Sequence, residues 1–192
     1  MTLILVRHGR TVANASGLLL GRADPPLDEV GRAQAAALAS IVERPVRVIA
    51  SPLRRTRETA EAFGRPVEID ERWIELDYGD FDEQPLGSLP PGTWERWRAD
   101  LDFRPPNGET LRELGVRVRA ACEDLAEDAR KSDVVVVTHV SPLKASLAWA
   151  IGVGDEIAWR VHVTPALVTR VGIRPNGPVL LTFGETAHLP AG

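Results

Sequence analysis

The sequence predicts a three-layer α/β/α protein whose central sheet is mostly parallel and has an antiparallel edge. Two aliphatic runs, 3–6 and 134–137, have the composition of strands buried on both faces, as in a parallel sheet. Segments with helical patterns follow these runs. Near the C-terminus, 166–171 and 179–183 flank a Pro-Asn-Gly-Pro turn, which predicts a hairpin at the sheet edge.

Strands and helices alternate in the first part of the chain. In order, we expect a strand over 3–6, a loop rich in Gly, Ala, Asp and Pro over 13–27, a helix from 29 to about 43, a strand over 46–50 and a helix to about 63. Asp28 is a suitable N-cap for the first helix. Ser51 as N-cap and Pro52 at the first helical position predict the start of the second.

Residues 65–109 form an irregular segment, interrupted by prolines, that we expect to act as a lid or to contact substrate. It contains a short strand over 67–69 and a short helix over 93–101. A long helix follows over about 110–129, then the strand 134–137, and then a helix to about 151 for which Ser141 and Pro142 repeat the cap arrangement. Residues 185–192 are expected to be a tail.

The totals indicate one globular domain over residues 1–192. A net charge of -4 argues against nucleic-acid binding. The apolar runs are too short for a membrane span, and the N-terminal run is too short for a signal-peptide core, so we expect a cytoplasmic monomer or homodimer. Cys122 is the only cysteine, so no intrachain disulfide and no cysteine-rich zinc site is expected.

Polar residues follow three of the predicted strands. The first strand leads into Arg7-His8-Gly9 and the fourth into Thr138-His139, while Ser51 and Arg55 follow the second. Ligands of parallel sheets bind at the carboxyl ends of the strands. Guanidinium groups and helix N-termini suit a phosphoryl group, and an imidazole can attack phosphorus. As a bare pattern, the two histidines also fit a metal pair, an acid–base pair or two structural residues.

These motifs make the sequence resemble the histidine phosphatase superfamily, also called the phosphoglycerate mutase-like proteins. The signature of that family is an Arg-His-Gly triplet (RHG motif) at the end of the first strand, here 7–9. The other matching blocks come in family order from residue 3 to about 150: Thr11 and Asn14, 24–27 with Gly31 and Gln34, 51–55 with 59–60, 75–79, 107–110 and 138–139. The resemblance implies a phosphoglycerate mutase-like fold.

The resemblance also implies a role for each matching residue. His8 is the expected nucleophile, which becomes phosphohistidine. Arg7, Arg55 and His139 are expected to bind the phosphoryl oxygens, and Asn14 to add a polar substrate contact. Glu75 is the expected acid that protonates the leaving alcohol and the base that later activates water. No metal and no cofactor is implied. The other basic residues near these blocks, Arg54 and Arg57, are expected at the surface, while His162 is expected to be structural and His188 to lie in the tail.

Protonation sets conditions on this chemistry. His8 must be neutral to attack, and nearby arginines favour the neutral form, whereas His139 is useful mainly when charged. Glu75 must begin protonated, which burial or the negative charge of the substrate can arrange. A rate maximum on the acid side of neutrality is therefore expected.

The chain departs from the family pattern at several positions. Arg10 stands where the family usually has Glu or Gln, and favours either a second anionic group on the substrate or a salt bridge to a nearby carboxylate. After His139 the family commonly has glycine and then arginine, whereas this chain runs through Ser141 to Lys144. Residues 79–83 replace a familiar Trp-Glu-Gly ending, so the surroundings of Glu75 are expected to differ.

A metal-independent phosphatase acting on a small phosphorylated metabolite is the expected function. Glycolytic mutases of the family are longer and carry an Arg-His pair where this chain has Leu76-Asp77, which favours hydrolysis over mutase chemistry. A non-catalytic phospho-ligand binding module is the other alternative, although His8 and Glu75 are both present. A zinc enzyme would need a third ligand that no spacing supplies. Candidate substrates include sugar phosphates, phosphoglycerate derivatives and α-ribazole phosphate.

Overall fold

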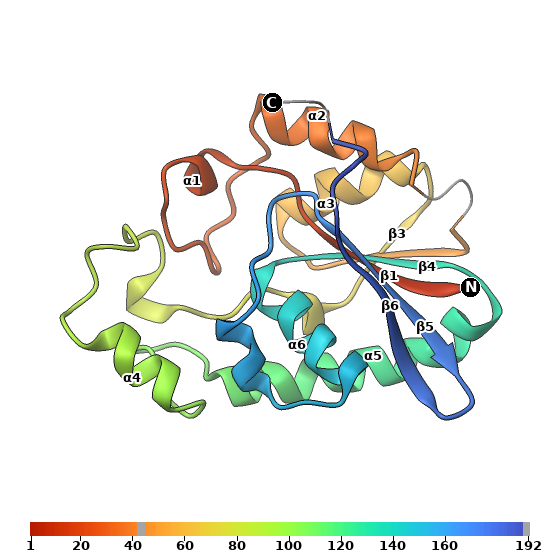
Figure 1. Cartoon of the computed structure of the whole chain (residues 1–192). Coiled ribbons are helices and arrows are strands. Elements are labelled where there is room, and N and C mark those ends of the chain that lie inside the picture. Colours follow the sequence, from red (N-terminus) through yellow and green to blue (C-terminus); the bar gives the residue numbers. More distant parts are fainter. Residues whose placement is uncertain (42–44, 190–192) are drawn as a thin grey trace.

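A six-stranded sheet lies at the centre of the molecule, and helices cover both of its faces (Figure 1). The computed structural model describes residues 1–41 and 45–189. The strand order is β3-β2-β4-β1-β5-β6. The strands are β1 (Thr2–Arg7), β2 (Arg47–Ala50), β3 (Val67–Ile69), β4 (Val134–Thr138), β5 (Val168–Arg174) and β6 (Gly177–Glu185). The predicted fold class is confirmed.

The sheet is parallel on one side and antiparallel on the other. Strands β1 to β4 pair in parallel with one another, whereas β5 runs antiparallel to β1, and β6 antiparallel to β5. The last pair is the predicted hairpin. In the register of β1 with β4, Arg7 is opposite Thr138, and the amide of His8 donates to the carbonyl of Thr138 at 2.9 Å. The two histidines therefore leave the sheet side by side.

The helices form two layers. Helices α2 and α3 lie above the sheet in Figure 1, whereas α5 and α6 lie below it. The helices are α1 (Val12–Ala15), α2 (Glu29–Leu38), α3 (Arg54–Ala60), α4 (Thr93–Ala99), α5 (Leu111–Lys131) and α6 (Val140–Ile151), with the 3₁₀ helices η1 (Glu61–Phe63), η2 (Glu71–Trp73), η3 (Gly79–Phe81) and η4 (Asp155–Trp159). None of the helices in the described residues is both long and apolar enough to pass through a bilayer.

Alternation along the strands explains their continuous apolar sequence. Leu3 and Leu5 pack on the side of α5 and α6, whereas Ile4 and Val6 pack on the side of α2 and α3. All four side chains are fully buried, because a strand covered on both faces has no solvent side. This packing fixes the ends of β1 and β4, and so the backbone that carries the histidines.

Three predicted helix boundaries were wrong. Helix α3 has Leu53 as its N-cap rather than Ser51, and α6 has His139 as its N-cap rather than Ser141. The hydroxyl of Ser51 contacts His139, and the backbone amide of Ser141 contacts a carboxylate, so both residues serve the site instead. Helix α2 ends at Leu38 rather than near residue 43; positions 42–44 lie outside the described residues.

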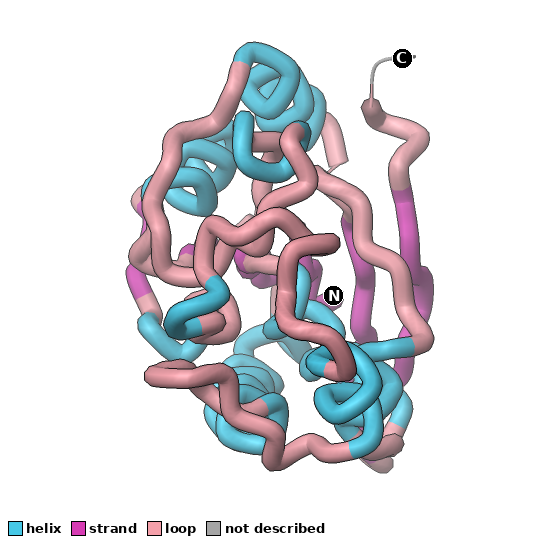
Figure 2. Tube along the Cα trace, turned by 90° about the vertical axis from the view of Figure 1, so that its left-hand side faces the viewer, coloured by secondary structure: helices cyan, strands magenta, loops and turns pink. Residues whose placement is uncertain are grey.

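The loops gather on the edge of the molecule where the parallel strands end (Figure 2). The expected loop 13–27 overlaps the one-turn helix α1, which Thr11 and Asn14 cap reciprocally. The segment 65–109 contains β3, η2, η3 and α4 within its irregular chain. Part of the expected tail is ordered: the Nε2 atom of His188 lies 3.0 Å from the carbonyl oxygen of Ala166.

Two glycines hold the loop after β1 against α2. A Cβ on Gly9 would lie 2.4 Å from the carbonyl oxygen of Gly31, and a Cβ on Gly31 would lie 2.0 Å from that of Arg10. Backbone therefore packs directly on backbone here. Gly9 thus permits a close approach of chain to chain.

Replacing Gly31 with alanine is expected to lower the free energy of unfolding by about 1–3 kcal/mol, because backbone must move to admit the methyl group. Gly87→Ala is the matched control, since a Cβ there has nothing within 4 Å. Urea denaturation of the two variants measures the difference. Equal stability of the two variants would show that the β1–α2 approach tolerates a side chain.

Candidate active site

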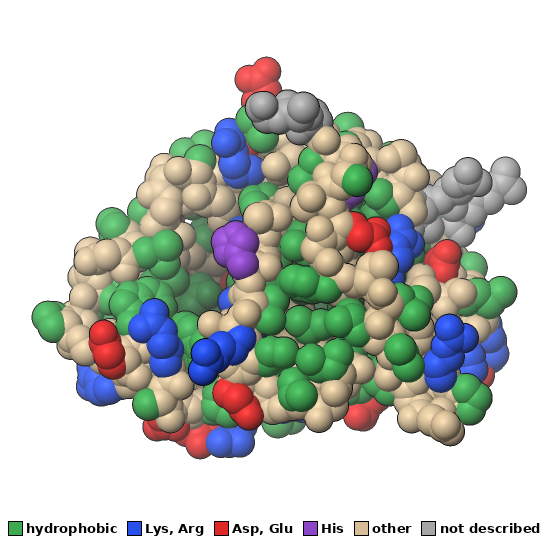
Figure 3. Space-filling view, in the orientation of Figure 1, with side chains coloured by type: hydrophobic (Ala, Val, Ile, Leu, Met, Phe, Trp, Pro, Cys, Tyr) green, Lys and Arg blue, Asp and Glu red, His purple; other side chains and the backbone are tan. Residues whose placement is uncertain are grey.

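The five predicted catalytic residues gather at the carboxyl edge of the parallel strands. Arg7, His8 and Glu75 line a cavity of about 250 Å³, visible as part of the hollow in the left half of Figure 3. Arg55 and His139 are fully buried beside it. The rings of His8 and His139 meet edge to face, with centroids 5.1 Å apart. Residues more than a hundred positions apart thus form one site.

His8 is held in one tautomer. Its Nδ1 atom lies 2.7 Å from the carbonyl oxygen of Gly9, which can only accept, so Nδ1 carries the proton and donates. The lone pair is then on Nε2. Burial lowers the pKa of His8 well below its usual range, and the positive charges of Arg55 and Arg7 lower it further. His8 is therefore a neutral imidazole with a free nucleophilic nitrogen.

His139 is also neutral in this structure. Its Nε2 atom lies 2.7 Å from the hydroxyl of Ser51, and burial, followed by the charges of Arg55 and Arg7, lowers its pKa well below the usual range. The expected charged form is therefore not the form of the free protein. A phosphate dianion is the kind of neighbour that favours a proton on this ring.

Arg7 and Arg55 are buried cations held by backbone carbonyls. Arg7 donates to Val163 at 2.7 Å, and Arg55 donates to Ala23 at 2.7 Å and to Gly21 at 2.8 Å. Burial lowers the pKa of Arg7 to about 10, while the charge of Glu75 raises it, so the group stays protonated at neutral pH. Burial also lowers the pKa of Arg55. One guanidinium group thus lines the small cavity and a second lies buried beside it.

Three buried nitrogen atoms at this site have no partner in the described part of the chain: Nε of Arg7, Nε of Arg55 and Nδ1 of His139. Buried polar atoms are nearly always hydrogen-bonded, so each exception calls for a partner. Two of these atoms are obligate donors, and the third becomes a donor when His139 is protonated. Donors of this kind suit a tetrahedral oxyanion.

Glu75 lies at the N-terminus of α6. Its Oε1 accepts from the backbone amides of Leu76 at 2.8 Å and Ser141 at 3.1 Å, and its Oε2 accepts from that of Val140 at 3.0 Å. Only 3% of the residue is exposed. The carboxyl group is therefore held by backbone amides. His139 is the N-cap residue of the same helix.

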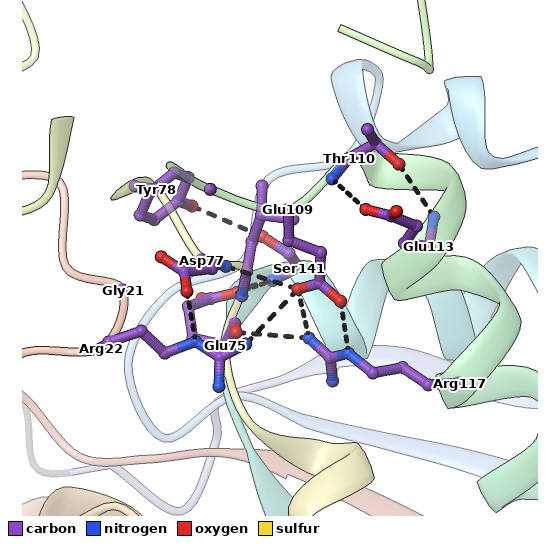
Figure 4. A network of polar contacts seen from close by, with 12 residues as sticks. Gly21, Arg22, Glu75, Asp77, Tyr78, Glu109, Thr110, Glu113, Arg117 and Ser141 are labelled. Carbon is purple, nitrogen blue, oxygen red and sulfur yellow. Dashed lines mark hydrogen bonds and ion pairs between the residues drawn. The ribbon is translucent and has the colours of Figure 1, made fainter. Parts of the chain in front are cut away.

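A polar network holds the chain around Glu75 (Figure 4). Arg117 on α5 donates to the carbonyls of Arg72 at 2.6 Å and Glu75 at 3.3 Å, and forms an ion pair with Glu109. Arg22 lies 3.6 Å from carboxylate oxygens of both Asp77 and Glu109. The sequence analysis missed the role of Arg117, because no local pattern distinguishes it from other charges on an amphipathic helix.

The strand end adds a further fixed point. Thr138 donates its hydroxyl to the carbonyl of Trp73 at 2.6 Å, which ties β4 to the segment just before Glu75. The carbonyl-to-hydroxyl bond is fully buried. Two contacts therefore connect the segment of Glu75 with that of His139. One is this bond between Thr138 and Trp73, and the other is the bond from the amide of Val140 to Glu75.

The remaining predicted residues divide between cavity and surface. Asn14 lines the cavity, and its Oδ1 accepts from Thr11 in the cap of α1. Arg10 donates to Asp28 at 2.8 Å. This confirms the salt bridge that was one of the two alternatives for Arg10. His162 was expected to be structural but is exposed and lines the cavity. Lys144 lines it as well.

The surface expectations hold for the other two arginines: Arg54 pairs with Glu58 on the same helix, and Arg57 is exposed. Among residues 1–41 and 45–189, no group of three or more His, Cys, Asp or Glu is arranged to hold a metal ion. The ionisable side chains that line the cavity are Arg7, His8, Glu75, Tyr78, Lys144 and His162.

The two buried imidazoles make stability depend on pH. The unfolded chain takes up protons on histidine below about pH 6.5, whereas folded His8 and His139 resist protonation. Their contribution is thus complete above that pH and is lost as pH falls, by up to about 1.4 kcal/mol per pH unit for each histidine. Urea denaturation should show a smaller slope in His8→Asn; an unchanged slope would contradict the neutral assignment of His8.

Comparison with known proteins agrees with this geometry. The model of the histidine phosphatase superfamily (branch 1) matches residues 3–186. The probable phosphoglycerate mutase GpmB of Yersinia enterocolitica is 34% identical to the chain, over 98% of it and 95% of the relative. A mycobacterial glucosyl-3-phosphoglycerate phosphatase solved with VO3 is 26% identical, with a TM-score of 0.86 over 96% of this chain and 99% of that one.

A second solved structure, the α-ribazole phosphatase of Shigella flexneri, is 27% identical, with a TM-score of 0.85 over 96% of each chain. The relatives therefore carry both mutase and phosphatase names. The family match extends over the sheet, the strand ends and every residue of the site. The chain belongs to the histidine phosphatase superfamily (branch 1) and is an enzyme of that superfamily.

Proposed function

We propose that the protein is a metal-independent phosphomonoester hydrolase that acts through a phosphohistidine on His8. The observation that carries the proposal is the neutral imidazole of His8, whose unprotonated Nε2 belongs to a site that also holds the guanidinium groups of Arg7 and Arg55 and the ring of His139. Two guanidinium groups and an imidazole can meet the charge on the equatorial phosphoryl oxygens without reorganisation. These fixed positive charges would stabilise the transition state, as a metal ion does in other phosphatases.

In the first step, Nε2 of His8 forms a bond to phosphorus while the bond from phosphorus to the ester oxygen breaks. Glu75 gives its proton to the leaving oxygen, so the alcohol departs neutral. The Nδ1–H of His8 keeps its bond to the carbonyl of Gly9, which stabilises the positive charge of the phosphorylated ring. The proton on Glu75 comes from solvent before this step, since a dianionic phosphomonoester has no proton of its own to give.

In the second step, Glu75 takes a proton from water and the resulting hydroxide attacks phosphorus. The bond from phosphorus to Nε2 breaks, and inorganic phosphate leaves. The carboxylate form suits this step, because the amides of Leu76, Val140 and Ser141 hold it in place as an acceptor. The same group thus serves as acid and base in turn.

Two positions favour hydrolysis over mutase chemistry. Leu76 and Asp77 stand where glycolytic mutases carry an Arg-His pair. Leu76 is 1% exposed, and the carboxylate of Asp77 faces Arg22 and the amide of Gly79. Neither residue brings a cation to the cavity. A mutase must hold a second phosphate, and these positions provide nothing for it.

The substrate is proposed to be a small phosphorylated metabolite. The relatives act, by name, on phosphoglycerate, glucosyl-3-phosphoglycerate and α-ribazole phosphate, all of which are small phosphate compounds. A cavity of about 250 Å³ accommodates a phosphoryl group and a few further atoms. It does not suit a folded phosphoprotein surface.

The decisive experiment is a phosphate-release screen over small phosphomonoesters, with EDTA present, run beside an assay for interconversion of 2- and 3-phosphoglycerate. Release that persists in EDTA, without interconversion, is expected. Interconversion faster than release would replace the hydrolase by a mutase. No release from any compound, together with tight phosphate binding, would favour the binding module. Loss of release in EDTA, restored by a divalent ion, would overturn metal independence.

A further inference from the structure

A second cavity adjoins the first. Its volume is about 180 Å³, and it shares lining residues with the phosphate cavity, namely Leu19, Tyr78, Leu86, Val140 and Lys144. Its remaining walls come mainly from α4, η4 and the start of α5. In Figure 3 the floor of the hollow between α1 and α4 consists of hydrophobic side chains. The two cavities thus adjoin along this shared lining, one with a polar lining and the other with a mostly apolar one.

Three tryptophans build the apolar end. Trp94 and Trp97 are stacked, with centroids 5.7 Å apart and planes 12° apart. Trp159 meets both edge to face, at 6.3 Å and 6.1 Å. Trp97 is only 1% exposed and belongs to the main core, so this wall is part of the folded structure. An aromatic wall of this kind offers both face and edge to a ligand ring.

Charge is nearly absent from this end. Of the described residues that line the second cavity, Lys144 alone is charged, and it stands at the junction with the phosphate cavity. Its ammonium donates to the carbonyl of Ala158 at 2.7 Å, which joins α6 to η4. A second phosphate at the far end would meet indole rings and aliphatic groups. The lining therefore fits an uncharged group.

We propose that the second cavity is the leaving-group subsite and that it binds a single apolar ring attached, through a short linker, to the phosphate. This inference rests on the proposed function, which places the phosphoryl group against His8 and so directs the leaving group of the ester toward the second cavity. An apolar protein cavity of about 150 Å³ is known to accommodate benzene, so 180 Å³ suffices for one six-membered ring. The preferred substrate is thus a ring-bearing phosphomonoester rather than a small polar phosphate such as phosphoglycerate.

The test compares benzyl phosphate with ethyl phosphate, two alkyl esters that differ in the ring. We expect kcat/KM to be at least about 10-fold higher for benzyl phosphate, because the ring leaves water for the apolar cavity. Binding of the non-hydrolysable 2-phenylethylphosphonate and propylphosphonate, measured by calorimetry, should show the same order. The binding measurement keeps the subsite testable even if neither ester is hydrolysed.

A pair of variants locates the effect. Ala158 lines the second cavity but not the first, so Ala158→Phe should fill the subsite and reduce the benzyl preference to below about 3-fold. Hydrolysis of ethyl phosphate should be retained. Ala99→Phe, which adds the same ring at an exposed position on α4, should leave the preference intact.

The outcomes separate the two proposals. Equal rates for the two esters and equal affinities for the two phosphonates would overturn the subsite while leaving the hydrolase in place. Preferential binding of the ring phosphonate without any phosphate release would support the subsite and refute the hydrolase. A benzyl preference that survives in Ala158→Phe would place the ring elsewhere and overturn the assignment.

Discussion

His8→Ala is expected to lower the rate of phosphate release by about 10⁴-fold or more, the scale seen when a covalent nucleophile is removed. The alanine has no lone pair to attack phosphorus. In the wild-type structure His8 is 2% exposed and its Nδ1 is held by the carbonyl of Gly9, so the substitution removes a nucleophile that is fixed in place. The rate is measured as phosphate release from the best substrate of the screen.

Phosphate binding provides the control for this variant. The guanidinium groups of Arg7 and Arg55 are held by backbone carbonyls and do not depend on the imidazole, so inorganic phosphate should still bind to His8→Ala. Rapid quenching of the wild type with labelled substrate should yield a labelled protein whose label maps to His8. Release at the wild-type rate by the alanine variant would refute the covalent mechanism.

Glu75→Gln is expected to reduce kcat/KM for alkyl phosphates by about 10²–10⁴-fold, the usual contribution of a general acid. The amide cannot give its proton to the leaving oxygen. Its NH₂ group would also face one of the backbone N–H groups that now donate to the carboxylate. Two donors would then meet, and that buried N–H would be left unpaired. The variant therefore loses both the proton and part of the fixed geometry.

The leaving group separates these two losses. The 4-nitrophenolate ion needs no proton to depart, so Glu75→Gln should transfer the phosphoryl group from 4-nitrophenyl phosphate to His8 with a much smaller loss, and phosphoenzyme should accumulate because water lacks its base. An equal loss with both classes of ester would contradict the acid role. So would a wild-type rate that rises steadily into the alkaline range.

Much of the fold was predictable because it depends on local burial. The runs 3–6 and 134–137 are apolar at every position, and they are the two central strands. The capping pattern of Asp28 located the start of α2. The hairpin at the sheet edge followed from its turn sequence. In each case the signal and the element lie within about ten residues of one another.

The helix starts at Ser51 and Ser141 were predicted wrongly for a physical reason. Both serines have good local cap chemistry, but each also has a polar partner distant in the sequence: the hydroxyl of Ser51 contacts the ring of His139 as well as the amide of Leu53, and the amide of Ser141 donates to Glu75. A functional site thus overrides local preference. Sequence patterns describe neighbours along the chain and not partners across the sheet.

The charge state of His139 was beyond sequence analysis for a related reason. The ring was expected to be useful mainly when charged against phosphate, but in the free protein burial, and then Arg55 and Arg7, which only the fold brings near, lower its pKa. The support of Glu75 by Arg117 has the same character, and so does the choice of Asp28 as the partner of Arg10, for which a salt bridge was one of two alternatives. The identities of the reactive residues follow from motifs, whereas their electrostatic state follows from assembly.

The placement of Glu75 on the amides of α6 affects which side chains the site can tolerate. Val140 and Ser141 hold the carboxylate through their N–H groups, so this support does not depend on which side chains they carry. This explains how the chain can lack the glycine and arginine common after the second histidine without losing the support of its acid–base group. Proline at either position would remove one of these bonds, since it has no N–H to give.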